Sequence, residues 1–143
     1  VQGGLIRLFL RWAGERRTVV YGHVFDIAAF GAMAVITSGA LALILTPLAA
    51  LGAVITPALS AMMSREVGEN AQGELQGVLV SLHALAMILS PLLMTGVFAA
   101  FTGPSAPIYM PGAPFAVSMI LMVLGLAVFL GRPRVRAKRN RVA

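Results

Sequence analysis

The sequence LQGVLVSLHALAMILSPLLMTGVFAAF, Leu75 to Phe101, decides the class of fold. It contains no Asp, Glu, Lys or Arg, and the uncharged run continues to Gly131. A helix needs about 20 apolar residues to cross a bilayer core of roughly 30 Å. The run from Leu75 to Gly131 holds 57 residues (131 − 75 + 1) and is therefore long enough to cross a membrane twice.

A second apolar run extends from Thr18 to Ser64, and its only formal charge is Asp26. Across the 143 residues, 59% are hydrophobic and 11% are charged. Soluble domains carry roughly 25% charged residues, so this chain lacks the polar surface that a soluble domain needs. In lipid, a helix satisfies its own backbone hydrogen bonds. The sequence therefore predicts an all-α, polytopic membrane helix bundle.

Small polar residues and prolines divide the two runs into spans. The first run divides at Thr37-Ser38-Gly39, and the second at TGPSAPIYMPGAP, Thr102 to Pro114, which cannot sustain a helix. The transmembrane helices are expected over residues 18–37, 41–63, 75–101 and 115–131. Residues 1–17 are interpreted as the end of a preceding helix and a basic loop, and residues 132–143 as a basic tail.

Three prolines lie inside these expected spans, at Pro47, Pro57 and Pro91. Each removes one backbone donor and is expected to bend its helix. Proline is common in membrane helices, so such bends can be structural. They can also let a helix line a cavity or rock between two states.

Basic residues lie outside the apolar runs. The segment RLFLRWAGERR, Arg7 to Arg17, carries four arginines, and RPRVRAKRNR, Arg132 to Arg141, holds six of the eleven basic residues. Lys and Arg in short connections remain on the cytoplasmic side. We therefore expect both charged ends and the Ser64–Glu74 connection in the cytoplasm of a bacterium, with the chain in its inner membrane. The same placement argues against a nucleic-acid partner.

Asp26 is the candidate functional residue. It lies near the middle of the first span, within GHVFDIAAFG, Gly22 to Gly31. An acid at mid-bilayer costs on the order of 2.5–3.5 kcal/mol, and such residues commonly serve as proton relays or counter-charges. We expect Asp26 to face protein or a water-filled cavity and to exchange protons. The alternative is a structural acid that is hydrogen-bonded to Ser38 or to a further helix.

The two histidines are weaker candidates. His23 lies one turn before Asp26, where it either shares a proton with the acid or sits near the cytoplasmic interface. His83, in the third span, is interpreted as a packing or hydrogen-bonding residue. Neither histidine has the spacing of a metal site, and no nucleophile, carboxylate pair or phosphate loop is present. The sequence predicts a protein that is not an enzyme and that needs no cofactor other than a proton gradient.

The chain has no cysteine, and it begins with Val1 rather than Met. Residues 1–10 do not have the pattern of a signal peptide, because Arg7 interrupts the apolar stretch. We expect the chain to be part of a longer protein; a non-Met start is the alternative.

Four motifs resemble the tetracycline efflux group of the major facilitator transporters. They correspond to the loop before the ninth helix, the ninth helix with its Gly-x-x-x-Asp, the tenth helix with its following loop, and the eleventh helix. In this chain they read GERR (14–17), GHVFD (22–26), PALSAMMSREV (57–67) and QGELQGVLVSLHALAMILSPLL (72–93).

The resemblance implies the C-terminal part of a twelve-helix drug:proton antiporter, from the end of helix eight to helix twelve. It implies that Asp26 is important for transport, that Gln76 and Gly77 begin the eleventh helix, and that Gly14, Arg16 and Arg17 belong to the cytoplasmic gating loop. The expected partners are the lipid bilayer, an N-terminal half and a drug such as tetracycline. The alternatives are a major facilitator transporter of another solute, or a membrane scaffold or truncated relic without transport.

Overall fold

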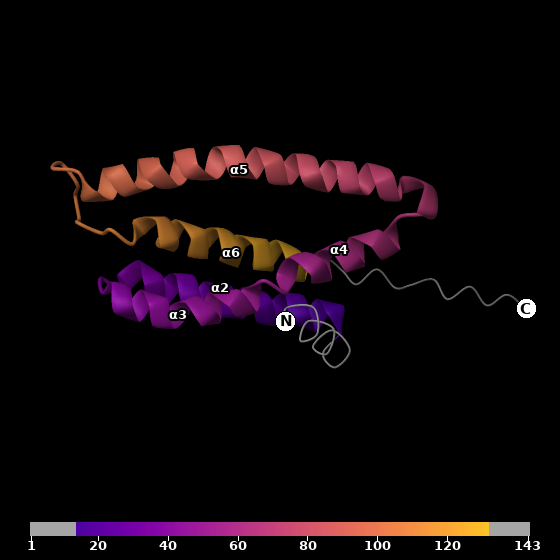
Figure 1. Cartoon of the computed structure of the whole chain (residues 1–143), viewed down its shortest axis with the longest axis horizontal. Coiled ribbons are helices and arrows are strands. Elements are labelled where there is room, and N and C mark those ends of the chain that lie inside the picture. The colour runs from indigo at the N-terminus through magenta and orange to yellow at the C-terminus, as the bar shows by residue number, and fades with distance from the viewer. Residues whose placement is uncertain (1–13, 132–143) are drawn as a thin grey trace, which may run out of the picture.

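The computed structural model describes residues 14–131 of the chain, and all regular structure in that range is helical (Figure 1). The elements in chain order are α2 (Glu15–Val35), α3 (Gly39–Gly52), α4 (Ile55–Glu66), the short 3-10 helix η1 (Glu69–Ala71), α5 (Gln72–Thr102) and α6 (Ala113–Gly131). The predicted end of a preceding helix, with Arg7 and Arg11, and the basic tail from Arg132 lie outside the described residues.

Within the described residues, four stretches are long and apolar enough to cross a membrane: residues 15–35, 39–66, 69–102 and 113–131. The all-α membrane class is therefore confirmed. The helices differ from the predicted spans by up to three residues at their ends, and the second span is divided into α3 and α4. The division lies at Ala53 and Val54, four and three residues before Pro57.

Pro57 gives a physical reason for this division. A proline inside a helix lacks the N–H that would bond to the carbonyl four residues earlier, here that of Ala53, and its ring clashes with that carbonyl. The Ala53 N–H donates to the carbonyl oxygen of Ala50 at 3.3 Å, a tight last turn for α3. Regular bonding resumes where Ala58 donates to Val54 at 3.2 Å. Pro47 and Pro91 lie inside α3 and α5, which are continuous helices.

Gly14 is the N-cap residue just before helix α2, and its φ of 75° is in the left-handed region that favours glycine. Both the backbone N–H and the hydroxyl of Thr18 donate to the Gly14 carbonyl oxygen, each at 3.0 Å. At the other end of the helix, the backbone of Ala34 lies so close to Gly112 that a Cβ at Gly112 would overlap it. The α5–α6 connection therefore packs tightly on the end of α2.

The helices form a compact group around α2, from which α5 stands apart (Figure 1). Helix α2 packs against α6, α3 and α4, whereas α5 makes sparser contacts with α6, η1 and α4. A buried hydrophobic cluster contains Val19, Ile55 and Ala58, with Leu59, Met62 and Phe129 packed against it. No residue of α5 is buried.

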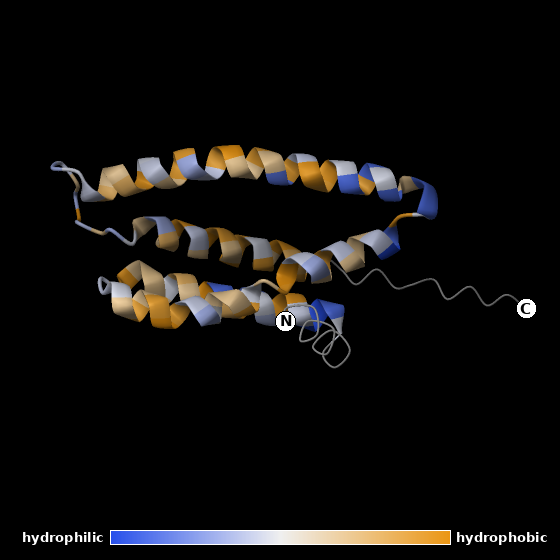
Figure 2. Cartoon of the chain, in the orientation of Figure 1, coloured by the Kyte–Doolittle hydropathy of each residue, from blue (hydrophilic) through white to orange (hydrophobic). Residues whose placement is uncertain are grey.

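One end of the molecule gathers the hydrophilic residues, as Figure 2 shows. The start of α2, the end of α4 and the start of α5 lie there, and α6 ends on the same side (Figure 1). The opposite end holds the α2–α3 and α5–α6 connections. This arrangement is that of helices that cross a membrane in alternate directions.

Candidate functional site

The candidate site is built around Asp26, the twelfth of the 21 residues of α2. Its side chain is 7% exposed, so it is withdrawn from the surface of the chain. At about 1.5 Å per residue it lies about 16 Å along the helix, near the middle of a bilayer core of roughly 30 Å. Asp26 is therefore a buried carboxyl group in the middle of a span.

Gly52, the last residue of α3, makes room for this carboxyl group. A Cβ at position 52 would overlap both carboxylate oxygens of Asp26. The acid thus lies directly against the backbone of α3, beside the point where α3 ends and the chain continues into α4. Only glycine at this position permits so close an approach.

A second glycine brings the same two parts of the chain together. A Cβ at Gly22, one turn before Asp26, would overlap the side chain of Ile55 and closely approach that of Val54. Gly22 and Gly52 therefore let α2 pack tightly across the α3–α4 break. Small residues allow this kind of close helix contact in membranes.

Ser38 is ruled out as the partner of Asp26 by its position. Ser38 precedes the first residue of α3 and is exposed, whereas Asp26 contacts Gly52, the last residue of that helix. The fourteen residues of α3 separate these points by about 20 Å. The Ser38 version of the structural alternative is therefore wrong for this chain.

His23 is buried, 7% exposed, and lies between α2 and α6. Its Nδ1 is 2.9 Å from the Val19 carbonyl oxygen, and since a carbonyl only accepts, Nδ1 carries the proton in this contact. A Cβ at Gly125 of α6 would lie 3.7 Å from Nε2. His23 and Asp26 thus share the buried side of α2 but face different helices, α6 and α3. His23 is the ninth residue of α2 and is enclosed by the chain.

The other predicted site residues lie apart from Asp26. Gln76 and Gly77 are exposed on α5, which packs on α6, η1 and α4. Gly77 accepts a hydrogen bond from the Ser81 hydroxyl at 2.8 Å through its carbonyl oxygen. His83 is also exposed on α5. Within the described residues, the chain does not bring these α5 side chains to the acid.

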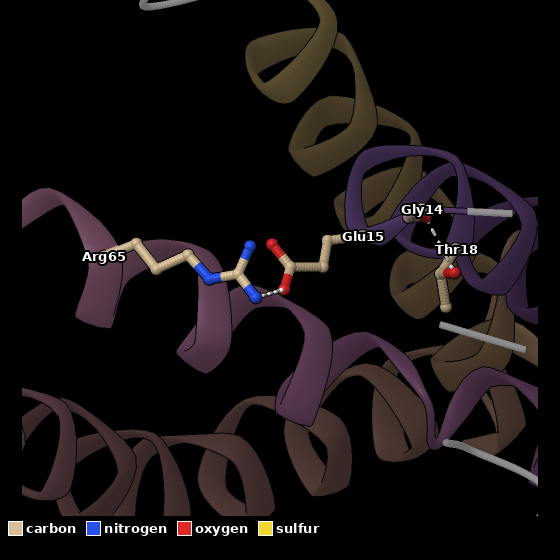
Figure 3. A network of polar contacts seen from close by, with 4 residues as sticks. All are labelled: Gly14, Glu15, Thr18 and Arg65. Carbon is tan, nitrogen blue, oxygen red and sulfur yellow. Dashed lines mark hydrogen bonds and ion pairs between the residues drawn. The ribbon is translucent and has the colours of Figure 1, made fainter. Parts of the chain in front are cut away.

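The predicted loop residues Gly14, Arg16 and Arg17 lie at the beginning of α2. Arg16 places its guanidinium 5.4 Å from the ring centre of Phe129 in α6, and Arg17 is exposed. Next to them, Glu15 pairs with Arg65 of α4 at 2.9 Å (Figure 3). The charged end of α2 therefore contacts both α4 and α6.

The side chain of Gln72 makes three hydrogen bonds across the connection between α4 and α5. Its Nε2 donates to the Ser64 carbonyl oxygen at 2.6 Å and to that of Val67 at 3.4 Å, and its Oε1 accepts from the Ser64 hydroxyl at 2.8 Å. We name this set the Gln72 clasp.

Sequence reasoning did not single out Gly52. The motifs that carry the resemblance contain Gly22, Glu15, Arg65 and Gln72, but the sequence did not predict the contacts that these residues make. For Gly52 the available signal was a glycine five residues before a proline inside a span. For Arg65 it was the single basic residue in an otherwise acidic connection.

The fold and the site define an all-α membrane protein with one buried acid between packed helices. The chain is similar to the tetracycline resistance protein of class G from Vibrio anguillarum, with 36% identity over 76% of this chain and 31% of that protein. It is also similar to two tetracycline resistance proteins from Escherichia coli. The class C protein is 38% identical over 61% of this chain and 22% of that protein, and the class B protein is 37% identical over 72% of this chain and 24% of that protein.

These matches confirm the resemblance to the tetracycline resistance proteins that the motifs indicated. The chain spans between about a fifth and a third of the length of these relatives. No family model matches the chain, and no solved structure does.

Proposed function

We propose that this chain forms part of a proton-coupled membrane exporter of tetracycline or a similar drug. The observation that carries the proposal is a carboxyl group buried in the middle of a span, in a chain related to tetracycline resistance proteins. In this proposal Asp26 takes up a proton from one side of the membrane and releases it to the other as the drug moves in the opposite direction.

The surroundings of Asp26 support this role. A charge in the membrane interior is unfavourable by on the order of 2.5–3.5 kcal/mol, so a carboxyl group that alternates between two protonation states favours different surroundings in each. Asp26 of α2 lies beside the break between α3 and α4. Divided helices of this kind border the binding sites of many transporters. Small rearrangements at the α3–α4 break would therefore change the surroundings of the acid.

The remaining residues have proposed accessory roles. His23, buried one turn before Asp26, would respond to the charge of that carboxyl group. Gln76 and Gly77 would face the transported solute once further helices cover α5. Gly14, Arg16 and Arg17 would belong to a cytoplasmic gate, with the C-terminus on the same side. Pro57, more than Pro47 or Pro91, would supply the flexible point.

The proposal includes a partner, because four spans do not enclose a complete central pathway. The relatives are three to five times longer than the part that this chain matches. We propose that an N-terminal half completes the transporter in the inner membrane of a bacterium. The relatives give no support to the alternatives, a different solute or a scaffold without transport.

A chimera tests the function directly. The segment of the class G protein that this chain matches is replaced by the chain, and tetracycline/proton exchange is measured in inverted membrane vesicles. Asp26→Asn should reduce exchange at least about tenfold, which corresponds to about 1.4 kcal/mol in the coupled step, while the protein level is unchanged. Glu66→Gln, which removes an exposed acid from the end of α4, is the matched control and should retain exchange. Full exchange in the Asp26→Asn chimera would contradict the proposed role.

A further inference from the structure

The beginning of α2 contains a small basic cavity on its outer side. Its volume is about 200 Å³, and it is lined by Arg16, Arg17, Val20 and Tyr21. We name it the α2 basic cavity. It combines two guanidinium groups, one phenol hydroxyl and one branched aliphatic side chain.

The helix period explains how these side chains meet. Residues three and four positions apart lie on the same side of a helix, so Val20 and Tyr21 lie beside Arg17 one turn further along. Thr18 and Val19 are fully buried on the opposite side, against the other helices. Within residues 14–131, the cavity therefore faces away from the core, on a side that lipid can reach.

The position of the cavity at the start of a span is the one expected for contact with phospholipid head groups. Helix α2 begins at Glu15, and the hydrophilic residues gather at this end of the molecule (Figure 2). Tyrosine is enriched at this membrane–water boundary. Helix α6 ends nearby, where Phe129 contacts Arg16, and the six basic residues of the tail follow in sequence directly after Gly131. Dense basic charge beside a span attracts anionic lipids.

An apolar strip continues from the cavity along α2. Tyr21 is 49% exposed and Val24 is 52% exposed, and Ala28 is exposed one turn further on the same side. A free phosphate ion would use only the arginines. A phospholipid would use both parts, with its phosphate at the arginines and an acyl chain along the strip.

We propose that the α2 basic cavity binds the phosphate group of an anionic phospholipid from the surrounding bilayer. Arg17 holds the phosphate with the planar, two-pronged geometry that suits this group, and Arg16 adds a second positive charge from its place beside Phe129. The Tyr21 hydroxyl donates to a head-group or ester oxygen, and Val20 and Val24 contact the upper part of one acyl chain. Lipid binding here does not rest on the proposed transport function, although Arg16 and Arg17 are also assigned there to a cytoplasmic gate.

The test uses the full chain, purified in an uncharged detergent and examined by native mass spectrometry with defined lipids. The wild-type chain should retain phosphatidylglycerol in preference to phosphatidylcholine. Arg17→Gln should lower this retention about fivefold, because a charge-assisted contact to phosphate is lost. Arg65→Gln removes the same charge from the end of α4, outside the lining of the cavity, and should lower retention less than twofold if the site is specific.

Three results would overturn the proposal. Equal losses in Arg17→Gln and Arg65→Gln would indicate a diffuse attraction of the whole basic surface rather than a site. Unchanged retention in Arg17→Gln would remove the cavity from lipid binding. Displacement of the lipid by inorganic phosphate at an equal phosphate concentration would show that the site binds a phosphate ion and does not recognise the rest of the lipid. Val24→Asn leaves the arginines in place and tests the acyl contact; it should also reduce phosphatidylglycerol retention.

Discussion

At the scale of single residues, the site depends on the absence of a side chain at Gly52. The carboxyl group of Asp26 occupies the space that a Cβ of residue 52 would need. The presence of an acid in the span was predictable from composition, because a lone charge in an apolar run is conspicuous. Its neighbour was not, since the register between α2 and α3 depends on side-chain packing that no spacing in the sequence specifies.

We expect Gly52→Ala to displace Asp26 and to lower the free energy of unfolding by about 1–3 kcal/mol, the usual result of an overpacked core. The measurement is denaturant unfolding of the chain in detergent. Gly39→Ala is the matched control in the same helix, because no atom lies within 4 Å of a Cβ there. A Gly52→Ala protein as stable as the Gly39→Ala protein would contradict the close contact with Asp26.

At the scale of elements, the α3–α4 break is the main departure from the predicted spans. The sequence indicated that Pro57 would disturb its helix, but a proline can produce a bend or an interruption. The structure has an interruption, and α2 packs across it through Gly22 and Gly52. Which outcome occurs depends on whether neighbouring helices support the open turn, and this information is not local.

Pro57→Ala should restore the missing backbone donor and join α3 to α4. Spin labels at Leu43 and Glu66, both exposed, would then be separated by about 35 Å along one straight helix of 23 steps. Double electron–electron resonance should give a shorter distance between the two spin labels in the wild type than in Pro57→Ala. Pro47→Ala, inside the continuous helix α3, should leave the wild-type distance unchanged. The same distance in all three proteins would mean that Pro57 does not maintain the break.

The Gln72 clasp should govern local opening of the α4–α5 connection. Gln72→Ala removes three hydrogen bonds, each contributing about 0.5–1.5 kcal/mol in net terms. Together they contribute at least about 1.5 kcal/mol, and about 1.4 kcal/mol corresponds to a factor of ten. We therefore expect amide hydrogen exchange in residues 64–72 to become at least about tenfold faster. Gln76→Ala, one turn later on an exposed position, is the control for stability and should leave exchange in this segment unchanged. Equal exchange in both variants would argue against the clasp.

At the scale of the whole molecule, α2 organises the fold and its charged end contacts two other helices. Apolar length and charge placement were sufficient to predict the all-α membrane class. They did not predict that α5 would stand apart with no buried residue. Length and hydropathy identify which segments enter a bilayer, but not which ones pack together, because every span is apolar.

The Glu15–Arg65 pair links the start of α2 to the end of α4 (Figure 3). The Arg65 side chain is 75% exposed, so we expect a coupling of only about 0.2–1 kcal/mol. A double-mutant cycle with Glu15→Gln and Arg65→Gln, read by thermal unfolding, measures it, and the coupling should shrink in high salt. The exchanged pair, Glu15→Arg with Arg65→Glu, should recover most of the wild-type stability. A coupling free energy above the roughly 0.2–1 kcal/mol of exposed ion pairs would indicate that the pair is shielded from solvent.

The interruption between α3 and α4 also has a consequence for hydration. An open turn in hydrocarbon leaves peptide groups that must find hydrogen-bond partners in protein or in water. Ala53 is exposed at this turn, midway along a 28-residue span, and the Asp26 carboxyl group lies beside it. We infer that water molecules penetrate to this depth. Deuterium from heavy water should then reach the amides that follow the turn sooner than those in the middle of α6, whose ladder of helical bonds is unbroken.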